Sequence, residues 1–507
     1  MRSRDLGAYY ENAKTEELST SMNTSVIFTK GVMWSGTSSF LNSLFRFGIL
    51  IFLVRILGPY SFGLFSLTLI IVDFGNDIGD FGMGPALVQK QNINKRLLDS
   101  IFWTVLIGCS TLTFIAVLTA PIVAHFFHES ILIQLIIVSS ISFIIRGAGL
   151  VHKAMLLKHM LFKKIAIIEC GSTIIFGASS ILFIYFEFGV WSLIYGLLLQ
   201  RLLDTILSWC FWKYRPSFQY NYKEIREVLK FAKNITGERI SYFISSRMDY
   251  IIVGRVLSTT ALGFYTLASE LTTLPAKRIS TIVSGVAFPT FSIMQNNNDG
   301  LRRAYLKVNK TLSLITFPLL AGLFVLSSQF VHIFYDSSWI PTIMPMQILC
   351  LVGAIKSIMH NNGAIFYAKN RTDISLKWGV IQLVIIPLPL ILGSFYGLPG
   401  IAVALSVTYI CFFVYLQRIL NSLLEIKIGD YLNMLMPSVA YSLGIILLCT
   451  ISKGLLNRLI GNNIVLEVSI LILASTICYL LIIYRYERNL WAEITGLLKA
   501  SLKPRAT

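Results

Sequence analysis

Charged residues are scarce in this chain. Asp, Glu, Lys and Arg make up 13% of its 507 residues, whereas 55% are hydrophobic. A soluble chain carries about a quarter charged residues. The apolar residues come in blocks of about 20, the length of helix that crosses roughly 30 Å of hydrocarbon. The composition therefore excludes an ordinary soluble protein and predicts an all-α polytopic membrane protein.

Sequence motifs for catalysis and metal binding are also missing. The chain has no GxxxxGK[ST] phosphate loop, no HExxH and no GxSxG motif, and its loops are too short for a catalytic domain. We therefore expect neither an enzyme nor a bound cofactor or metal. None of the seven cysteines belongs to a CxxC or Cys/His spacing, so they predict no disulfide framework. The polar first 24 residues predict that no signal peptide is cleaved.

Fourteen apolar spans can be read along the chain. They cover residues 31–57, 60–83, 100–124, 131–152, 164–186, 190–212, 232–254, 262–291, 311–335, 341–367, 376–395, 399–420, 431–452 and 464–484. We predict a cytoplasmic segment (1–30), an N-lobe of six spans (31–212), a cytoplasmic linker (213–231), a C-lobe of six spans (232–420), two further spans (431–484) and a cytoplasmic tail (485–507).

The basic residues are divided unequally between the two sides of the membrane. The net charge is +18, but most Lys and Arg lie in the connections that follow even-numbered spans, and only Arg55, Arg255, Lys453 and Arg458 lie in loops on the other side. Basic loops stay on the cytoplasmic side. This distribution predicts that both termini are cytoplasmic, and it explains the charge without any nucleic-acid partner.

Three short segments recur in the same order about 200 residues later. The segment RILGPYSFG (55–63) resembles RVLSTTALG (255–263), PALVQKQN (85–92) resembles PTFSIMQN (289–296), and VAHFF (123–127) resembles FVHIF (330–334). Six spans per repeat give both halves the same orientation in the membrane. Parallel repeats of this kind place the cargo site of a transporter between the two halves.

Eight basic residues fall inside predicted spans. A cation at the bilayer centre costs roughly 2.5–3.5 kcal/mol, so such residues usually face a bundle interior or a watery cavity. Together they predict a cationic lumen for an anionic cargo. The eight are Arg46, Arg146, Arg201, Arg239, Arg247, Lys277, Arg278 and Lys356.

Arg46 and Arg247 hold nearly equivalent places in the repeat. Each lies about 12–13 Å from the outer end of its span at 1.5 Å per residue. We expect them to face each other in the lumen, where a guanidinium can grip phosphate oxygens in a bidentate manner. Permanent pairing with a carboxylate is the alternative, and Asp249 is the neighbour that Arg247 offers.

The other bases and the acids leave two roles open. Lys356 and His360 are four residues apart, with Asn361 and Asn362 beside them, and predict one polar helix face. Arg201 and Asp204 are expected to pair within their helix, and Arg239 to reach the inner surface. The diphosphate-binding candidates are Arg46, Arg146, Arg247, Lys277, Arg278 and Lys356. The candidates for charge balance or ion coupling are Asp73, Asp77, Asp80, Asp249 and Glu270. Asp73, Asp77 and Asp80 are predicted to lie on one stripe of a helix, and charge balance is the favoured role for them. Glu270 and Lys277 lie on one helix face, and an internal ion pair between them is the alternative to cargo binding by Lys277.

Several motifs resemble one family of membrane transporters. The segments RILGPYSFG (55–63), RMDYIIVGR (247–255), LGFYTLA (262–268), FPTFS (288–292) and DSSW (336–339) resemble Wzx-type polysaccharide flippases. These belong to the multidrug/oligosaccharidyl-lipid/polysaccharide exporter superfamily, and colanic-acid-type lipopolysaccharide exporters are the most similar. The resemblance covers roughly residues 30–420. Ser258, Thr259 and Thr260 depart from the Gly or Gly-Pro that the family often has there, which concerns turn geometry.

The resemblance implies two six-helix lobes and two trailing helices. It implies a cargo of undecaprenyl-diphosphate-linked oligosaccharide, such as an O-antigen unit, flipped across the bacterial inner membrane and passed to polysaccharide polymerase machinery. A cation-coupled multidrug exporter of the same superfamily remains the alternative. The number of charged residues does not decide between the two functions, because the spans contain eight acids as well as eight bases. The acids are Asp73, Asp77, Asp80, Glu169, Asp204, Glu238, Asp249 and Glu270.

Overall fold

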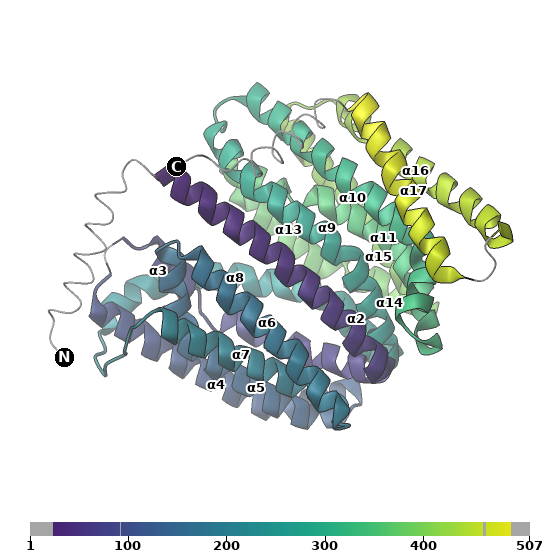
Figure 1. Cartoon of the computed structure of the whole chain (residues 1–507). Coiled ribbons are helices and arrows are strands. Elements are labelled where there is room, and N and C mark those ends of the chain that lie inside the picture. Colours follow the sequence, from purple (N-terminus) through teal and green to yellow (C-terminus); the bar gives the residue numbers. More distant parts are fainter. Residues whose placement is uncertain (1–23, 92, 460–462, 488–507) are drawn as a thin grey trace. The chain divides into compact units, whose positions relative to one another are not determined.

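The computed structural model describes residues 24–91, 93–459 and 463–487 (Figure 1). Every regular element in these ranges is a helix, and no strand occurs in them. The all-α fold expected from the sequence is confirmed. The predicted terminal segments fall mostly on residues 1–23 and 488–507, which lie outside the described ranges.

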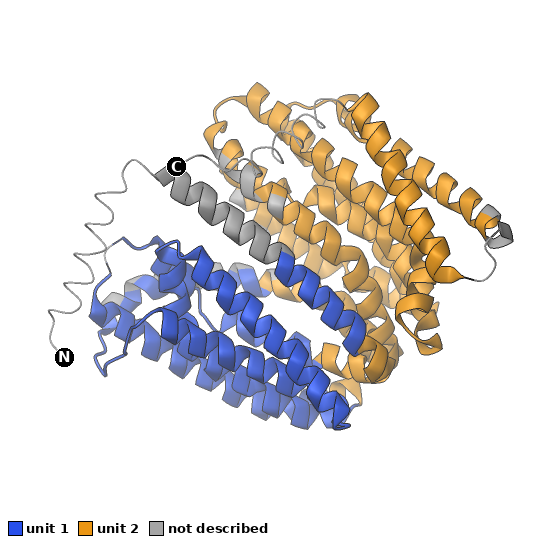
Figure 2. Cartoon of the chain, viewed as in Figure 1, with its two compact units in different colours: residues 1–53, 68–125, 129–240 blue, residues 54–67, 126–128, 241–507 orange. Residues whose placement is uncertain are grey.

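The chain divides into two compact units, each described here by itself (Figure 2). Unit 1 comprises the chain up to Leu53 together with Thr68–His125 and Glu129–Ile240. Unit 2 comprises Val54–Leu67, Phe126–His128 and the chain from Ser241 onward. The lobe limits expected from the sequence stay a prediction.

Unit 1 is built on a set of long helices. α6 (Phe162–Tyr185) packs along α7 (Trp191–Phe211), and α7 packs along α5 (Ile131–Lys158). The remaining helices that contribute to the unit are α2 (Thr24–Ile78), α3 (Met83–Gln89), α4 (Lys95–Phe127) and α8 (Tyr222–Ile252). The middle stretch of α2 (Val54–Leu67) and α8 from Ser241 onward belong to unit 2.

Unit 2 is centred on α10 (Asn298–Phe334). This helix packs against α9 (Thr259–Ile293), α11 (Ile343–Met359) and α16 (Ile428–Leu459), and α17 (Ile464–Tyr486) packs against α16. The other elements are η1 (Val253–Leu257), η2 (Ser337–Thr342), α12 (Asn362–Ala368), α13 (Thr372–Ile385), α14 (Pro387–Ser394) and α15 (Gly397–Leu424).

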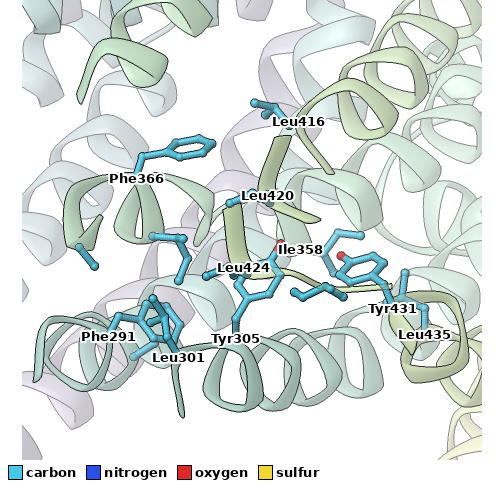
Figure 3. Packing of buried hydrophobic residues seen from close by; sticks show 14 residues of the cluster. Phe291, Leu301, Tyr305, Ile358, Phe366, Leu416, Leu420, Leu424, Tyr431 and Leu435 are labelled. Carbon is cyan, nitrogen blue, oxygen red and sulfur yellow. The ribbon is translucent and has the colours of Figure 1, made fainter. Parts of the chain in front are cut away.

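One apolar cluster in unit 2 fills the space between several of these helices. Figure 3 shows Phe291, Leu301, Tyr305 and Leu420 among its buried members. The Tyr305 hydroxyl lies in this cluster 3.1 Å from Asn362 Oδ1 and 3.2 Å from Gln417 Oε1. Hydrogen bonds between helices help hold a bundle together where packing against lipid gives no hydrophobic driving force.

Glycine and proline interrupt the helices at two places. Within α2, Gly58 has φ +73°, a conformation that glycine adopts without strain, and Pro59 follows it. The interruption lies between the first two predicted spans. The eleventh predicted span is likewise broken, because α13 ends at Ile385 and α14 starts at Pro387.

Eleven segments of the described chain are long and apolar enough to cross a membrane. One of them includes both arms of the interrupted α2, which the sequence divides into two spans. α8 and α9 lie where the seventh and eighth spans were expected but are not among the eleven. The polytopic fold is confirmed, whereas the count of fourteen stays a prediction.

Several expected loops are helical. Residues 302–310 lie inside α10, which begins at Asn298, and α8 begins at Tyr222, within the predicted linker. Hydropathy marks where a helix leaves hydrocarbon, but the backbone hydrogen bonds of the helix continue beyond that point. The expected connections are therefore partly helical, while the points at which the chain leaves the membrane stay a prediction.

Candidate functional site

Charged side chains from three helices of unit 1 gather around Arg201 of α7. This guanidinium lies within electrostatic reach of Arg46 on α2, Asp73 on α2 and Arg146 on α5, as well as Asp204 on its own helix. Its Nε is buried and has no hydrogen-bond partner within the described structure. The sequence placed all five residues inside spans, and the structure brings the other four within electrostatic reach of Arg201.

Asp204 does not pair with Arg201 as expected. Its Oδ1 accepts a hydrogen bond from Lys153 Nζ at 3.2 Å, and the same ammonium lies 3.8 Å from Glu169. Lys153 comes from α5 and reaches across to α7. The three-residue spacing was a poor guide because packing of α5 on α7 provides a better partner than the same helix does.

Arg146 is half-buried and contacts the main chain of α2. Its Nη1 donates a hydrogen bond to the carbonyl oxygen of Asn76. The Asn76 side chain is 5% exposed, and neither atom of its amide has a partner in the described structure. Both residues line a cavity of about 10 Å³, room for about one water molecule. Its lining also includes Gly75, Gly79, Asp80, Cys109, Phe143, Gly147 and Leu150.

Asp80 lies outside the helix to which the sequence assigned it. α2 ends at Ile78, so Asp73, Asp77 and Asp80 do not form one continuous helical stripe. In the turn, Asp80 accepts a hydrogen bond from the Gly82 amide at 2.9 Å. It also forms an ion pair with Arg239, with 2.8 Å between Oδ1 and Nη1. Arg239 thus has an ion-pair partner, and its expected reach to the inner surface stays a prediction.

In unit 2, Arg247 lies over an aromatic ring. Its guanidinium carbon is 5.2 Å from the centre of the Tyr250 ring. The expected neighbour, Asp249, is buried and accepts a hydrogen bond from the Tyr265 hydroxyl at 2.6 Å. Tyr250 and Tyr265 meet edge to face with centres 5.4 Å apart. One cation and one carboxylate are thus held by two contacting tyrosines.

Lys356 of α11 is also placed on an aromatic ring. Its Nζ lies 4.5 Å from the centre of the Tyr409 ring of α15. Tyr409 lies within electrostatic reach of Tyr265, which connects Lys356 to the tyrosines beside Arg247. A cation over a ring gains up to about 2 kcal/mol when it is desolvated. We call Arg247, Tyr250, Tyr265, Lys356 and Tyr409 the cation–tyrosine cluster.

The polar face expected around Lys356 is interrupted. α11 ends at Met359, and the next residues turn into α12. Asn361 accepts a hydrogen bond from Ser284, and Asn362 accepts one from Tyr305. These amides therefore bond to neighbouring helices, while His360 is exposed and lies within electrostatic reach of Lys277.

The other candidates are more open. Arg46, Asp77, Lys277 and Arg278 have exposed side chains, and Glu270 is half-buried. Arg46 and Arg247 belong to different units, so their expected facing arrangement stays a prediction.

The tyrosines of the cluster and Asn76 were missed by the sequence analysis. Tyrosine inside an apolar span is ordinary, and the sequence contains 22 of them. The informative signal was the closeness of Tyr250 to Arg247 and Asp249 along the chain. The partnership of Lys356 with Tyr409 joins residues more than fifty positions apart, which no local pattern indicates.

The bundle of apolar helices with cations inside it defines a multi-pass membrane protein. Its fold resembles a solved structure described as lipid II flippase MurJ in an inward closed conformation, with a TM-score of 0.73, 18% identity, and coverage of 90% of this chain and 99% of that one. It also resembles an inward-facing multidrug resistance MATE family transporter of the MOP superfamily, with a TM-score of 0.55, 17% identity, and coverage of 76% and 95%. At these identities the likeness concerns the fold.

Residues 52–344 match the family model described as polysaccharide biosynthesis protein, and the chain belongs to this family. Among its relatives, lipopolysaccharide biosynthesis protein WzxC of Escherichia coli (strain K12) is 27% identical and covers 78% of this chain and 83% of its own length. Teichuronic acid biosynthesis protein TuaB of Bacillus subtilis (strain 168) is 24% identical, with coverage of 81% and 86%. The family resemblance expected from the sequence is confirmed.

Proposed function

We propose that this chain flips a lipid-diphosphate-linked oligosaccharide from the cytoplasmic to the outer leaflet by alternating access through a cationic lumen. Family membership supports the polysaccharide part of this proposal. The names of the similar proteins, lipopolysaccharide biosynthesis protein and lipid II flippase, support a lipid-linked glycan as the cargo.

The observation that carries the proposal is the placement of basic side chains in apolar helices. Arg46, Arg146 and Arg201 gather in unit 1, and Arg247 and Lys356 lie in the cation–tyrosine cluster of unit 2. A diphosphate cannot enter hydrocarbon without something replacing its water. Guanidinium groups provide charge and paired donors for phosphate oxygens.

The tyrosines suit the same cargo. A ring face beside Arg247 or Lys356 stabilises the cation through its π electrons. The phenol of Tyr265 is already bonded to Asp249, which keeps that carboxylate from standing unpaired in a low-dielectric interior. We infer that Asp249 and Asp80 balance charge, and that Arg46, Arg146, Arg247, Lys277, Arg278 and Lys356 provide the diphosphate contacts.

The proposal includes a location and an orientation. Flipping of a polyprenyl-diphosphate glycan belongs to the bacterial inner membrane, and the distribution of Lys and Arg supports an orientation with both termini in the cytoplasm. Undecaprenyl diphosphate is the carrier we propose. No catalytic step is required, because only the position of the cargo changes.

The cargo can be tested in cells that lack the chromosomal gene. Cells that make the glycan should accumulate its lipid-linked form on the cytoplasmic side, and this chain should relieve that accumulation. The rival function, export of cationic drugs, predicts raised tolerance to such compounds with no effect on the lipid-linked glycan. That outcome would replace the proposal by the multidrug alternative.

A further inference from the structure

The segment 213–222 is fastened to the start of α4 by a buried carboxylate. Asp99 is 0% exposed and accepts hydrogen bonds from the Tyr214 hydroxyl and from both the amide, at 3.1 Å, and the hydroxyl of Ser217. The amide of Asn221 donates to Ser100 Oγ at 2.8 Å. Burial, together with the bond to Asp99, raises the pKa of Tyr214, so its hydroxyl keeps the proton it donates.

His152 completes this attachment from α5. It is 0% exposed, and its Nε2 lies 3.0 Å from the carbonyl oxygen of Tyr214. Its ring stacks on Trp209 with centres 4.4 Å apart. The segment is therefore a fixed part of unit 1 at this end of α4.

The attachment holds an exposed phenylalanine at one position. Phe218 is 91% exposed and stacks on Trp103 of α4, with ring centres 4.8 Å apart. Trp103 Nε1 donates to the carbonyl oxygen of Ser217 at 2.9 Å. Tyr220 and Tyr222 are also exposed. Aromatic rings with one polar end gather where a membrane meets water.

A shallow, open groove runs along α4 from this aromatic pair. It has a volume of about 370 Å³, and its lining comes from a single face of the helix. Trp103 forms one end of the groove and Phe114 the other. Between them lie Leu106, Ile107, Ser110 and Thr111, and the two hydroxyls are already bonded to the carbonyl oxygens of Leu106 and Ile107. The groove therefore offers an apolar surface.

Exposed cations lie on both segments that meet at the aromatic end of the groove. Lys95 and Arg96 are exposed in the first turn of α4, and Arg96 is seven residues before Trp103, on the same helix face. Lys213 and Arg215 are exposed on the attached segment. The only acid of α4 and of residues 213–222 is Asp99, which is buried.

We propose that this groove and its basic rim form a binding site for one anionic phospholipid of the cytoplasmic leaflet, with an acyl chain along α4 and the headgroup beside Arg96 and Arg215. Phe218 and Trp103 lie at the level of the glycerol backbone. Charge complementarity selects an anionic headgroup, because polybasic surfaces next to a membrane attract anionic lipids. The site belongs to unit 1 alone and does not depend on which cargo the protein moves.

Native mass spectrometry of the detergent-purified full chain tests the site. The probes are phosphatidylglycerol and phosphatidylcholine with the same acyl chains. We expect one phosphatidylglycerol to be retained at least tenfold more strongly than phosphatidylcholine, and Arg96→Gln/Arg215→Gln to abolish this preference. Arg303→Gln/Arg418→Gln removes the same charge from exposed positions of unit 2 and should leave it unchanged.

Asp99→Asn distinguishes a lipid site with a defined structure from nonspecific attraction of anionic lipid to a basic surface. The substitution makes the protein more positive but weakens the attachment of residues 213–222. A built site predicts weaker retention of phosphatidylglycerol, whereas general attraction predicts equal or stronger retention. Phe218→Ser, at an exposed position that the fold does not need, should also weaken it. The proposal would be overturned if Arg303→Gln/Arg418→Gln lost the preference for phosphatidylglycerol as fully as Arg96→Gln/Arg215→Gln. It would also be overturned if Phe218→Ser and Asp99→Asn retained phosphatidylglycerol as strongly as the original protein.

Discussion

Gly63 and Gly263 make reciprocal close contacts in unit 2. A Cβ at Gly63 would lie 1.9 Å from the carbonyl oxygen of Thr259, and one at Gly263 would lie 2.0 Å from that of Pro59. The offset of 200 that aligns Gly63 with Gly263 also aligns Pro59 with Thr259. The main chains of α2 and α9 thus cross with the two-fold relation that the sequence repeat predicts.

Alanine at either glycine should destabilise the crossing. The added methyl group meets backbone, which cannot move aside as a side chain can, so we expect a cost of about 1–3 kcal/mol for Gly63→Ala and for Gly263→Ala. Thermal unfolding of the purified protein measures it. Gly48 and Gly322 have nothing within 4 Å of an added Cβ, so alanine there should be neutral or slightly stabilising. Equal effects at all four sites would contradict the crossing.

The ion pair between Asp80 and Arg239 should matter for stability more than for transport. Asp80→Asn removes a charge-assisted contact to a half-exposed partner, and we expect a loss of about 1–2 kcal/mol and lower abundance in the membrane. Asp77→Asn, at an exposed carboxylate three residues earlier, is the matched control and should leave abundance near normal.

Export per copy of protein then distinguishes charge balance from ion coupling. With the proton and Na⁺ gradients clamped and then collapsed, the Asp80→Asn protein that remains should keep the gradient dependence of the original. A variant of Asp73, Asp77 or Asp80 that is fully abundant but has lost this dependence would assign a coupling role to that carboxylate.

Tyr265→Phe should lower the stability of the protein, because it removes the hydrogen bond to the buried carboxylate of Asp249. Without the phenol, Asp249 loses its 2.6 Å hydrogen bond in a site where water does not replace it, which should cost about 1–3 kcal/mol of stability. Tyr396→Phe is the control, because Tyr396 is 82% exposed. Unfolding temperatures that do not differ between the two variants would show that Asp249 has no need of Tyr265.

The predicted topology can be checked at turns that the structure defines. Reporter domains inserted after Glu187 and Asp336 should be periplasmic, because these turns follow odd-numbered spans. Reporters after Met160 and Asn297 should be cytoplasmic. Two sites with the opposite result would reject both the orientation and the parallel repeat.

The sequence was sufficient for the helical architecture because the period of apolar blocks is set by the thickness of a bilayer. It located the break at Gly58 and the repeated glycines from residue type and offset. The apolar spans did not show where the helices begin, as at Asn298 and Tyr222. Polar residues can continue a helix into water, so a change to polar sequence does not mark the end of a helix.

The candidate site was only partly predictable. The positions of Arg146, Arg247 and Lys356 in apolar segments were sufficient to single them out. The partners of Arg146 and Lys356 were not predictable, because Asn76 and Tyr409 reach them through packing of helices distant in sequence. Asp204 was paired wrongly for the same reason: Lys153 on another helix has better geometry than Arg201 along the chain.

The most direct measurement of the central claim is flipping by purified protein in proteoliposomes. A lipid-diphosphate-linked oligosaccharide placed in one leaflet becomes accessible to a glycan-modifying enzyme outside only after it is flipped. Arg46→Ala and Arg247→Ala should each slow the appearance of modified glycan about ten- to a hundredfold, since a charge-assisted contact contributes about 1.5–3 kcal/mol. Arg247→Lys should restore part of the rate, because a point charge lacks the paired donors. Arg303→Gln should flip normally, and normal rates in both alanine variants would contradict the cationic-lumen account.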